Sequence, residues 1–208
     1  MENKMLLSEL LRPRRISELI LSPSVTDYLE RMAKSGWSLN LLFYGAPGIG
    51  KTSAARILSE RADVIEVDGT CLSEDKALQK SLASFVTSLS LSGVPKICLI
   101  DEAEYLSNDA QNRLLKVIEN SSRTVRFILT ANDVTKLKAA LRSRCEPICF
   151  DIAPKDRAFV IQRLVDRYEA VLPEFGFECD PVRLREIVGL GFPDLRSIAN
   201  KLELQFGV

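Results

Sequence analysis

A short apolar run leads directly into a glycine-rich turn that ends in Lys-Thr, since residues 41–53 read LLFYGAPGIGKTS. Glycine lacks a Cβ, so the backbone N–H groups of such a turn can face inward around a polyphosphate. The helix that we expect next points the positive end of its dipole at the same anion. This order of strand, turn and helix is typical of a phosphate-binding P-loop, and it predicts that the chain binds ATP or GTP.

The P-loop interpretation gives each residue of the turn a role. Lys51 is expected to reach the β- and γ-phosphates, and Thr52 is expected to give its hydroxyl to Mg²⁺. The other predicted nucleotide-binding residues surround the phosphates: Gly45, Ala46, Pro47, Gly48, Ile49, Gly50 and Ser53. The alternative is a tight turn that binds no nucleotide.

Composition excludes several classes of protein. Lys plus Arg equals Asp plus Glu at 28 each, and there is no His, which excludes histidine-based catalysis and histidine metal sites. Five cysteines without a C-x-x-C pair argue against a disulfide framework and a zinc site. No apolar run reaches the length of a membrane span, so we expect a soluble protein with no membrane partner, cytoplasmic or, in a eukaryote, nuclear.

Apolar runs alternate with segments of helical periodicity along most of the chain. The expected strands are five runs rich in β-branched or bulky apolar residues, at residues 41–44, 64–67, 97–100, 127–130 and 147–150. Helices are expected between them, for example over 25–33 and 108–120, with Ser22 and Ser107 as N-caps and Gly36 ending the first. This pattern predicts an α/β fold with a five-stranded parallel sheet covered by helices.

The strands cease from residue 153 onward. Helices are expected near residues 155–171, 181–188 and 193–205, the last two with proline near the first turn. We therefore predict two domains, an α/β nucleotide-binding domain over residues 1–151 and an all-helical lid domain over residues 152–208.

Polar side chains follow two of the expected strands. Asp101 and Glu102 end the third apolar run, and Asn132 follows the fourth. Since ligands bind beyond the carboxyl ends of parallel strands, we expect Asp101 to hold Mg²⁺, Glu102 to polarise the attacking water and Asn132 to lie beside the γ-phosphate. The alternatives are charges at a helix N-terminus for the acids and a turn residue or helix cap for Asn132.

Five motifs together resemble the clamp-loader branch of the AAA+ ATPases, which includes the small subunits of replication factor C and the T-even phage loaders. They are the opening LLRPRRISELIL, DEAE, AN, SRC and FPDLR. The resemblance covers essentially the whole chain, and SRC is its most specific element. The family implies a third, helical collar domain after the lid, which these 208 residues do not contain, so the sequence is either a fragment or a protein that assembles differently.

The resemblance also implies roles for single residues. Arg12 and Pro13 match the family's adenine-contact pair, Arg144 matches the arginine finger given to ATP on a neighbouring subunit, and Arg196 matches the second sensor on the lid. Gln111 matches a glutamine thought to relay DNA occupancy. The alternatives are solvated charges for the two later arginines and a solvated side chain for Gln111.

The function that the resemblance implies is an ATPase of a ring-like clamp loader that uses Mg-ATP to load a sliding clamp onto primer-template DNA. DNA contact through phosphates is expected from Lys76, Lys80, Arg113 and Lys116, whose alternative is an exposed, solubilising surface. Two other functions stay open: a non-hydrolysing scaffold subunit, and another AAA+ remodeller of DNA such as a helicase loader or a Holliday-junction motor.

Overall fold

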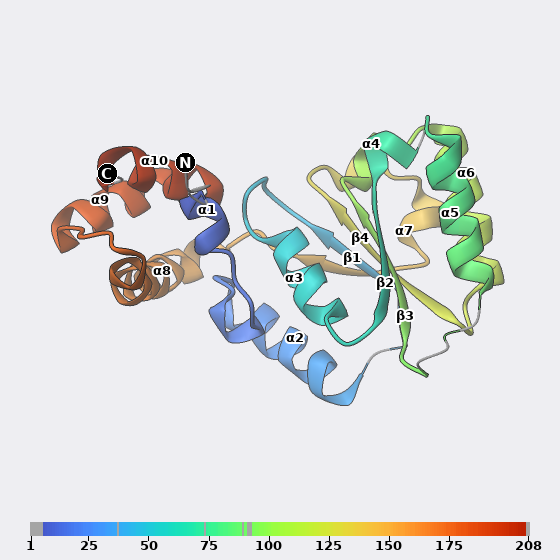
Figure 1. Ribbon diagram of the computed structural model, residues 1–208, viewed down its shortest axis with the longest axis horizontal. Helices are drawn as coiled ribbons and strands as arrows, with labels where there is room; N and C mark the ends of the chain where they lie inside the picture. Colours follow the sequence, from blue (N-terminus) through green and yellow to red (C-terminus); the bar gives the residue numbers. More distant parts are fainter. Residues whose placement is uncertain (1–5, 37, 73, 89, 91–92, 207–208) are drawn as a thin grey trace.

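Five parallel strands form the predicted sheet in a computed structural model, described here for residues 6–36, 38–72, 74–88, 90 and 93–206 (Figure 1). The strand order is β2-β3-β4-β1-β5, and each neighbouring pair is parallel. The strands are β1 (Leu41–Tyr44), β2 (Asp63–Asp68), β3 (Lys96–Asp101), β4 (Val125–Ala131) and β5 (Glu146–Cys149). All five expected runs therefore contain a strand. β2, β3 and β4 extend beyond the expected bounds at both ends, and β5 is shifted one residue earlier, so that residue 150 lies outside it.

The sheet is buried on both faces because its side chains alternate between two apolar clusters. On β1, Leu41 and Phe43 join one cluster and Leu42 joins the other. On β3, Cys98 and Ile100 share the cluster of Leu42. This alternation with apolar residues on both faces is what near-continuous apolar strands in a parallel sheet require.

Helices cover the two faces as separate layers (Figure 1). One apolar cluster includes residues of α2 (Pro23–Ser35) and α3 (Lys51–Ser59), and the other includes residues of α5, α6 and α7. The bounds of the remaining helices of this part are α4 (Gly69–Leu72), α5 (Lys76–Thr87), α6 (Asn108–Asn120), α7 (Ala139–Arg142), η1 (Ile16–Glu18), η2 (Ala103–Tyr105) and η3 (Val134–Lys136). The predicted α/β architecture is confirmed.

Two of the three predicted end signals act as expected. The hydroxyl of Ser107 accepts a hydrogen bond from the N–H of Ala110, and Gly36 ends α2 with φ at 70°. Ser22 is at the N-cap position of α2, but its side chain makes no capping hydrogen bond. Its hydroxyl instead lies 3.3 Å from that of Ser24.

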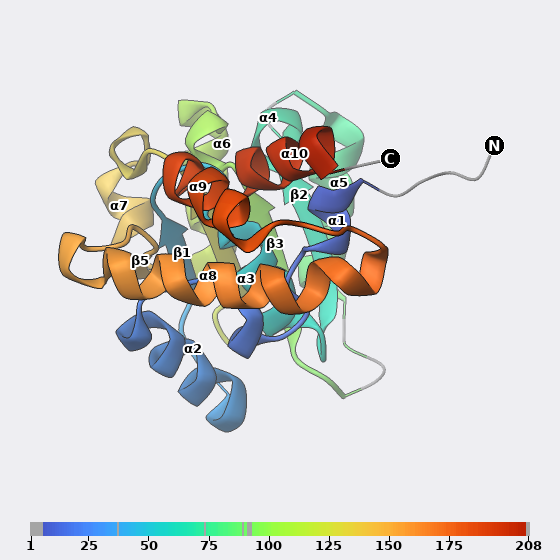
Figure 2. The same cartoon turned by 90° about the vertical axis from the view of Figure 1, so that its left-hand side faces the viewer.

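The C-terminal helices lie together in front of the sheet (Figure 2), and their apolar side chains form a cluster separate from the two clusters on the sheet. This part contains η4 (Pro154–Asp156), α8 (Arg157–Val171), η5 (Leu172–Phe175), α9 (Pro181–Gly191) and α10 (Leu195–Phe206). The N-terminal helix α1 (Leu7–Leu10) packs against α10, and Leu7, Leu11 and Ile20 belong to the same apolar cluster. The N-terminal segment thus shares a core with helices that follow it by some 150 residues, while the division at residue 152 stays a prediction.

The expected start of the last helix was wrong by two residues. Pro193 precedes α10, and Asp194 is the residue that caps it, since its Oδ1 accepts a hydrogen bond from the N–H of Ser197. Asp is among the residues that favour the N-cap position, and here it sets the start of the helix after Pro193. Proline does occupy the first turn of α9, where Asp180 is the cap.

None of the helices within the described ranges has both the length and the apolar character needed to cross a membrane.

Candidate nucleotide-binding site

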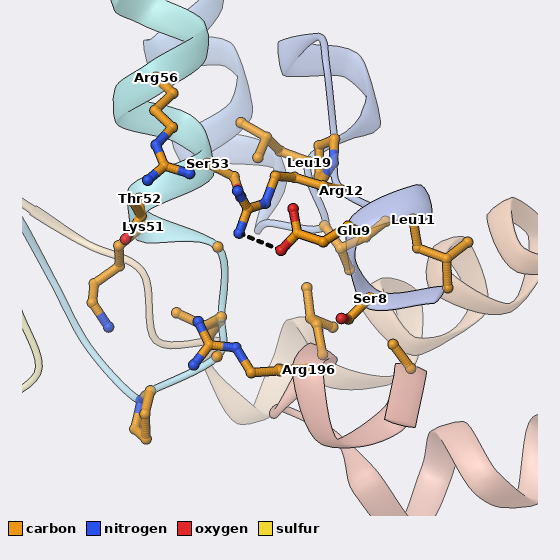
Figure 3. A pocket seen from close by; sticks show the side chains of 18 of the residues that line it. Ser8, Glu9, Leu11, Arg12, Leu19, Lys51, Thr52, Ser53, Arg56 and Arg196 are labelled. Carbon is orange, nitrogen blue, oxygen red and sulfur yellow. Dashed lines mark ion pairs between the residues drawn. The ribbon is translucent and has the colours of Figure 1, made fainter. Parts of the chain in front are cut away.

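A cleft of about 490 Å³ lies at the carboxyl ends of β1, β3 and β4, between α3, the N-terminal segment and α10 (Figure 3). Most of the predicted site residues line it: Arg12, Pro13, Pro47, Gly48, Ile49, Gly50, Lys51, Thr52, Ser53, Asp101, Glu102, Asn132 and Arg196. They come from residues as far apart as 12 and 196. The cleft is therefore assembled by the fold and not by any one segment.

The P-loop depends on glycine at two positions that approach other segments. Gly45 and Gly48 have φ angles of 138° and 72°, which L-residues rarely adopt. A Cβ on Gly45 would lie 2.8 Å from Oδ1 of Asp151, and one on Gly48 would overlap the carboxylate of Asp194. Both glycines are therefore required by φ and by close packing.

Gly45 and Ala46 are absent from the cleft wall within the described residues, and they act behind it. The N–H of Ala46 donates a 2.7 Å hydrogen bond to Oδ1 of Asp151, which follows β5. This bond anchors the base of the P-loop to the neighbouring strand. Asp151 had no place among the predicted residues, because nothing near it in the sequence indicates a partner 105 positions away.

Lys51 is buried, with 7% of its surface exposed. Its ammonium group donates to the carbonyl oxygens of Gly45 and Ala46, at 2.9 and 2.8 Å, and to Oδ1 of Asn132 at 2.8 Å. Burial lowers the pKa of Lys51, and nearby carboxylates, Glu104 foremost, oppose that shift. Three acceptors match the three ammonium protons, so donation to a phosphate requires the exchange of at least one of these bonds.

The two predicted Mg²⁺ ligands lie in contact. The hydroxyl of Thr52 donates a 2.8 Å hydrogen bond to Oδ1 of Asp101, and the hydroxyl of Thr130 donates to the same oxygen. Hydroxyl and carboxylate oxygens are the donor set that Mg²⁺ prefers beside phosphate. The residues present therefore fit the ion, and Thr130, which the sequence did not single out, orients the carboxylate.

Glu102 has an unusual backbone conformation. Its φ of 53° places it in the left-handed region, the one such residue other than glycine in the described part of the chain. Its N–H donates to the hydroxyl of Thr130, and its exposed side chain lines the cleft. Partial desolvation against the cleft, followed by the charges of Asp68 and Asp101, raises the pKa of Glu102, and Arg196 opposes that shift. A strained residue beside the cleft is consistent with the predicted catalytic role.

Asn132 is held from both ends of its amide. Its Oδ1 accepts from Lys51, and its Nδ2 donates a 2.7 Å hydrogen bond to Oε1 of Glu104. As the sequence predicts, Asn132 lies at the carboxyl end of β4. No role was predicted for Glu104, the last acid of DEAE, which is 6% exposed and lies in η2.

The N-terminal segment forms the side of the cleft expected to contact adenine. Arg12 pairs with Glu9 at 3.0 Å on that side (Figure 3). Arg167 of α8 donates to the carbonyl oxygen of Leu11 and also lines the cleft. Arg167 joins this segment to the C-terminal helices and was missed, because a lone arginine in an amphipathic helix is ordinarily read as solvated.

Arg196 extends from α10 toward the P-loop (Figure 3). It is exposed and lines the same cleft as Lys51. One residue earlier, the N–H of Leu195 donates to the carbonyl oxygen of Gly48 at 3.2 Å. The start of α10 is therefore joined directly to the P-loop, so a shift of this helix would move Arg196 relative to the phosphates.

Arg144 lies at the other end of the sheet. It precedes β5, whose first residue, Glu146, is in register with Leu41 at the start of β1, whereas the P-loop follows the end of β1. A rise of about 3.3 Å per residue puts more than about 10 Å of strand between them. Within the described residues Arg144 is not part of the cleft wall.

The guanidinium of Arg144 is half exposed and pairs with Glu119 of α6 at 2.9 Å. The next residue, Cys145, is 8% exposed, and burial raises the pKa of its thiol to about 12. The SRC motif thus points its arginine outward and buries its cysteine. Such an arrangement presents Arg144 to another molecule while anchoring the backbone that carries it.

Gln111 is buried at 3% exposure, so the alternative of a solvated side chain was wrong. Its Nε2 donates to the carbonyl oxygens of Leu106 and Lys136, and its Oε1 accepts from the N–H of Lys138. Leu106 follows the DEAE motif, and Lys138 precedes the helix that leads to Arg144. Gln111 therefore braces these two segments.

The four residues expected to contact DNA are all exposed, on α5 and α6. Arg113 forms an ion pair with Asp109 one turn earlier on the same helix. Their exposure fits both the predicted phosphate contacts and the alternative of a solubilising surface.

Comparison with known proteins gives one family match and many relatives. Residues 41–150 match the ATPase family associated with various cellular activities, AAA. The replication factor C small subunit of Thermofilum pendens is 30% identical over 92% of this chain and 60% of its own length. Replication factor C subunit 3 of Oryza sativa is 30% identical over 92% of this chain and 55% of its own length. The chain thus spans somewhat more than half of the curated relatives it matches.

Solved structures with the same fold include RuvB of Thermotoga maritima. One such structure has a TM-score of 0.74 and 20% identity, and covers 93% of this chain and 64% of that one. Another, described as a Holliday junction branch migration motor, has a TM-score of 0.69 and 22% identity with the same coverage. At this identity the likeness shows the fold alone.

Proposed function

This chain belongs to the AAA family of ATPases, and from that premise we propose that it is a clamp-loader subunit that hydrolyses Mg-ATP at a subunit interface. The family implies nucleotide binding. The single observation that supports hydrolysis at a subunit interface is the separation of two groups: Lys51, Thr52 and Arg196 line one cleft, while Arg144 lies exposed at the opposite end of the sheet.

Each predicted group has a position that suits its role in phosphoryl transfer. Lys51 and the amides at the start of α3 would bind the phosphates, and Thr52 and Asp101 would hold Mg²⁺, which when bound neutralises charge on the phosphate oxygens. Glu102 would accept a hydrogen bond from the attacking water, and Asn132 would orient that water. Arg196 would contact the γ-phosphate from the lid, over residues 152–208. Arg12 and Pro13 would contact the adenine.

Arg144 would complete the cleft of a neighbouring subunit. Its distance from the cleft of its own chain and its exposure support this role in trans. A planar guanidinium can neutralise charge that develops on the γ-phosphate, and an arginine finger is worth about 10³–10⁵ in rate. A ring-like oligomer is therefore part of the proposal, and isolated chains would hydrolyse ATP slowly.

The relatives named replication factor C support the clamp-loader assignment, at about 30% identity over most of this chain. We infer that the partners are other loader subunits, a sliding clamp and primer-template DNA. Exposed basic residues of α5 and α6 would contact DNA phosphates without reading sequence. We expect the assembly in the cytoplasm, or in the nucleus of a eukaryote, with no membrane partner.

ATP hydrolysis by the full-length protein with its partner subunits tests the proposal. We expect turnover that rises when the sliding clamp and primer-template DNA are added together, and clamp loading that stops without ATP. If neither clamp nor DNA changes the rate, the clamp-loader assignment is wrong. Tight nucleotide binding with no turnover in any assembly would favour the scaffold function, against which the complete P-loop argues.

A further inference from the structure

Glu104 is a buried carboxylate that the proposed function leaves without a role. It lies in η2, directly behind the cleft, with 6% of its surface exposed. Its Oε1 accepts two hydrogen bonds from Asn132, one from the backbone N–H at 2.9 Å and one from Nδ2 at 2.7 Å. Its Oε2 is also buried and has no hydrogen-bond partner among the described residues. Within the described residues, both hydrogen bonds of this side chain are therefore with one residue of the cleft, while its charge also acts on Lys51.

The amide of Asn132 lies between two groups of opposite hydrogen-bonding character. Lys51 has donors only and contacts Oδ1, whereas a carboxylate has acceptors only, and Glu104 contacts Nδ2. A turn of the amide by 180° would place its NH₂ against the ammonium and its oxygen against the carboxylate. Only one orientation of Asn132 therefore satisfies both neighbours.

We propose that Glu104 is a positioning residue that fixes the backbone and the amide orientation of Asn132 for ATP hydrolysis. This inference rests on the proposed function. Lys51 must exchange at least one of its three bonds to reach a phosphate, and where it exchanges the one to Oδ1 of Asn132, the two bonds that Asn132 donates to Glu104 still hold the amide. Glu104 thus keeps Asn132 in place at the stage when Asn132 has to orient water.

The role predicts a loss in turnover with little change in nucleotide affinity. Glu104→Ala leaves the P-loop intact but frees Asn132, and we expect kcat of the assembly to fall about 10²-fold, the usual effect of a misplaced group. Nucleotide Kd should change by less than about threefold, since the binding contacts remain. Glu104→Gln keeps an Oε1 acceptor for both N–H groups and should retain most of the activity.

A structural measurement checks the contact without turnover. In the full chain labelled with ¹⁵N, the backbone and side-chain amide signals of Asn132 should be protected from hydrogen exchange. Protection should be lost in Glu104→Ala and kept in Glu104→Gln. Equal protection in the wild-type chain and in Glu104→Ala would overturn the inference, and this result does not depend on whether the assembly hydrolyses ATP.

A double-mutant cycle separates positioning from a general loss of stability. If Glu104 acts through Asn132, then Glu104→Ala should reduce kcat no further once Asn132→Ala is present. Additive losses, or a Glu104→Gln variant as slow as Glu104→Ala, would overturn the inference and leave the proposed function standing. Absence of turnover in the wild-type assembly would instead refute the proposed function, and the exchange measurement would still decide the contact.

Discussion

The nucleotide cleft and the Arg144 end of the sheet are built in opposite ways. In the cleft, Lys51, Asn132 and Glu104 form a continuous set of hydrogen bonds in which two of the three side chains are buried. At the other end, one exposed ion pair with Glu119 holds Arg144. Exposed pairs contribute only about 0–1 kcal/mol. The side chains of the cleft are thus held in place before a nucleotide binds, whereas the ion pair of Arg144 with Glu119 is weak enough to break.

This difference indicates which step needs a second subunit: hydrolysis, to which Arg144 contributes, and not nucleotide binding in the cleft. A cleft whose side chains are already in place needs little rearrangement beyond the exchange of a Lys51 hydrogen bond, and so it can bind nucleotide within one chain. A weakly held arginine outside that cleft contributes only when another cleft is brought to it. Changes on the two sides should therefore separate binding by the chain from turnover by the assembly.

Arg144→Ala should have the largest effect. We expect kcat of the assembly to fall about 10³–10⁵-fold, because the γ-phosphate loses a transition-state charge partner. Nucleotide affinity of the isolated chain should not change. Steady-state ATPase and equilibrium binding of a fluorescent nucleotide measure the two quantities. Arg142→Ala, at the exposed last residue of α7 and two residues before Arg144, is the control, with an expected change of about twofold or less. An equal loss of kcat in both variants would refute the role of Arg144 as an arginine finger.

Lys51→Ala should act in the nucleotide cleft, on binding as well as on turnover. Loss of a preorganised donor to the phosphates should lower kcat/KM by about 10²–10³-fold. Unlike Arg144→Ala, it should also weaken nucleotide binding by the isolated chain. Unchanged affinity in an equilibrium titration would contradict the position that we give to this ammonium group.

Gly48→Ala should loosen the junction between the P-loop and α10. A Cβ at a φ of 72° costs about 1–2 kcal/mol, and this one would also overlap Asp194. We expect a lower free energy of unfolding in urea and weaker nucleotide binding. Gly189→Ala, inside α9 with open space around it, should instead stabilise by about 0.5–1 kcal/mol. If the free energy of unfolding changes in the same direction in both variants, Gly48 is not required by its φ and its packing against Asp194.

Asp151→Ala should weaken the base of the P-loop. It removes the acceptor for the N–H of Ala46, a bond that contributes about 1 kcal/mol. Asp151→Asn retains an Oδ1 acceptor and serves as the matched variant. Denaturant unfolding and nucleotide titration of both chains should place Asn near the wild type and Ala below it, and the reverse order would count against the contact.

Glu119→Gln should have the smallest effect. The pair with Arg144 is exposed, so the free energy of unfolding should fall by less than about 1 kcal/mol. Turnover by the assembly should stay the same or rise slightly, because Arg144 no longer has to leave a carboxylate. A large drop in turnover would show that Glu119 helps to position Arg144 in the cleft of the neighbouring subunit, and does more than pair with it in the isolated chain.

Local patterns predicted most of the cleft. The P-loop, the acids after the third strand and Asn132 each follow a recognisable strand, and parallel strands bring their carboxyl ends to one edge. The arginines were placed by family resemblance, and the structure puts Arg12 and Arg196 in the cleft wall and Arg144 outside it. The roles of these residues stay predictions until the variants are measured.

The supporting contacts were beyond reach of the same patterns. Asp151 and Arg167 have ordinary sequence surroundings, and the DEAE motif gives no role to its last acid, Glu104. Each of the three makes a hydrogen bond to a segment far along the chain. The alternative of a solvated Gln111 rested on the behaviour of most helical glutamines, and no periodicity marks a buried amide. Residues whose role is to hold a distant segment in place give no local sequence pattern by which they could be predicted.

The sequence by itself determined the alternation of strands and helices, the P-loop and the set of residues near the phosphates, because these depend on local spacing. Only the tertiary structure decided which distant groups meet. Lys51 and Asn132 are 81 residues apart, and they touch because β1 and β4 are neighbours in the sheet. Strand order also placed Arg144 at the far end from the cleft, since β5 begins where β1 begins and the P-loop follows where β1 ends.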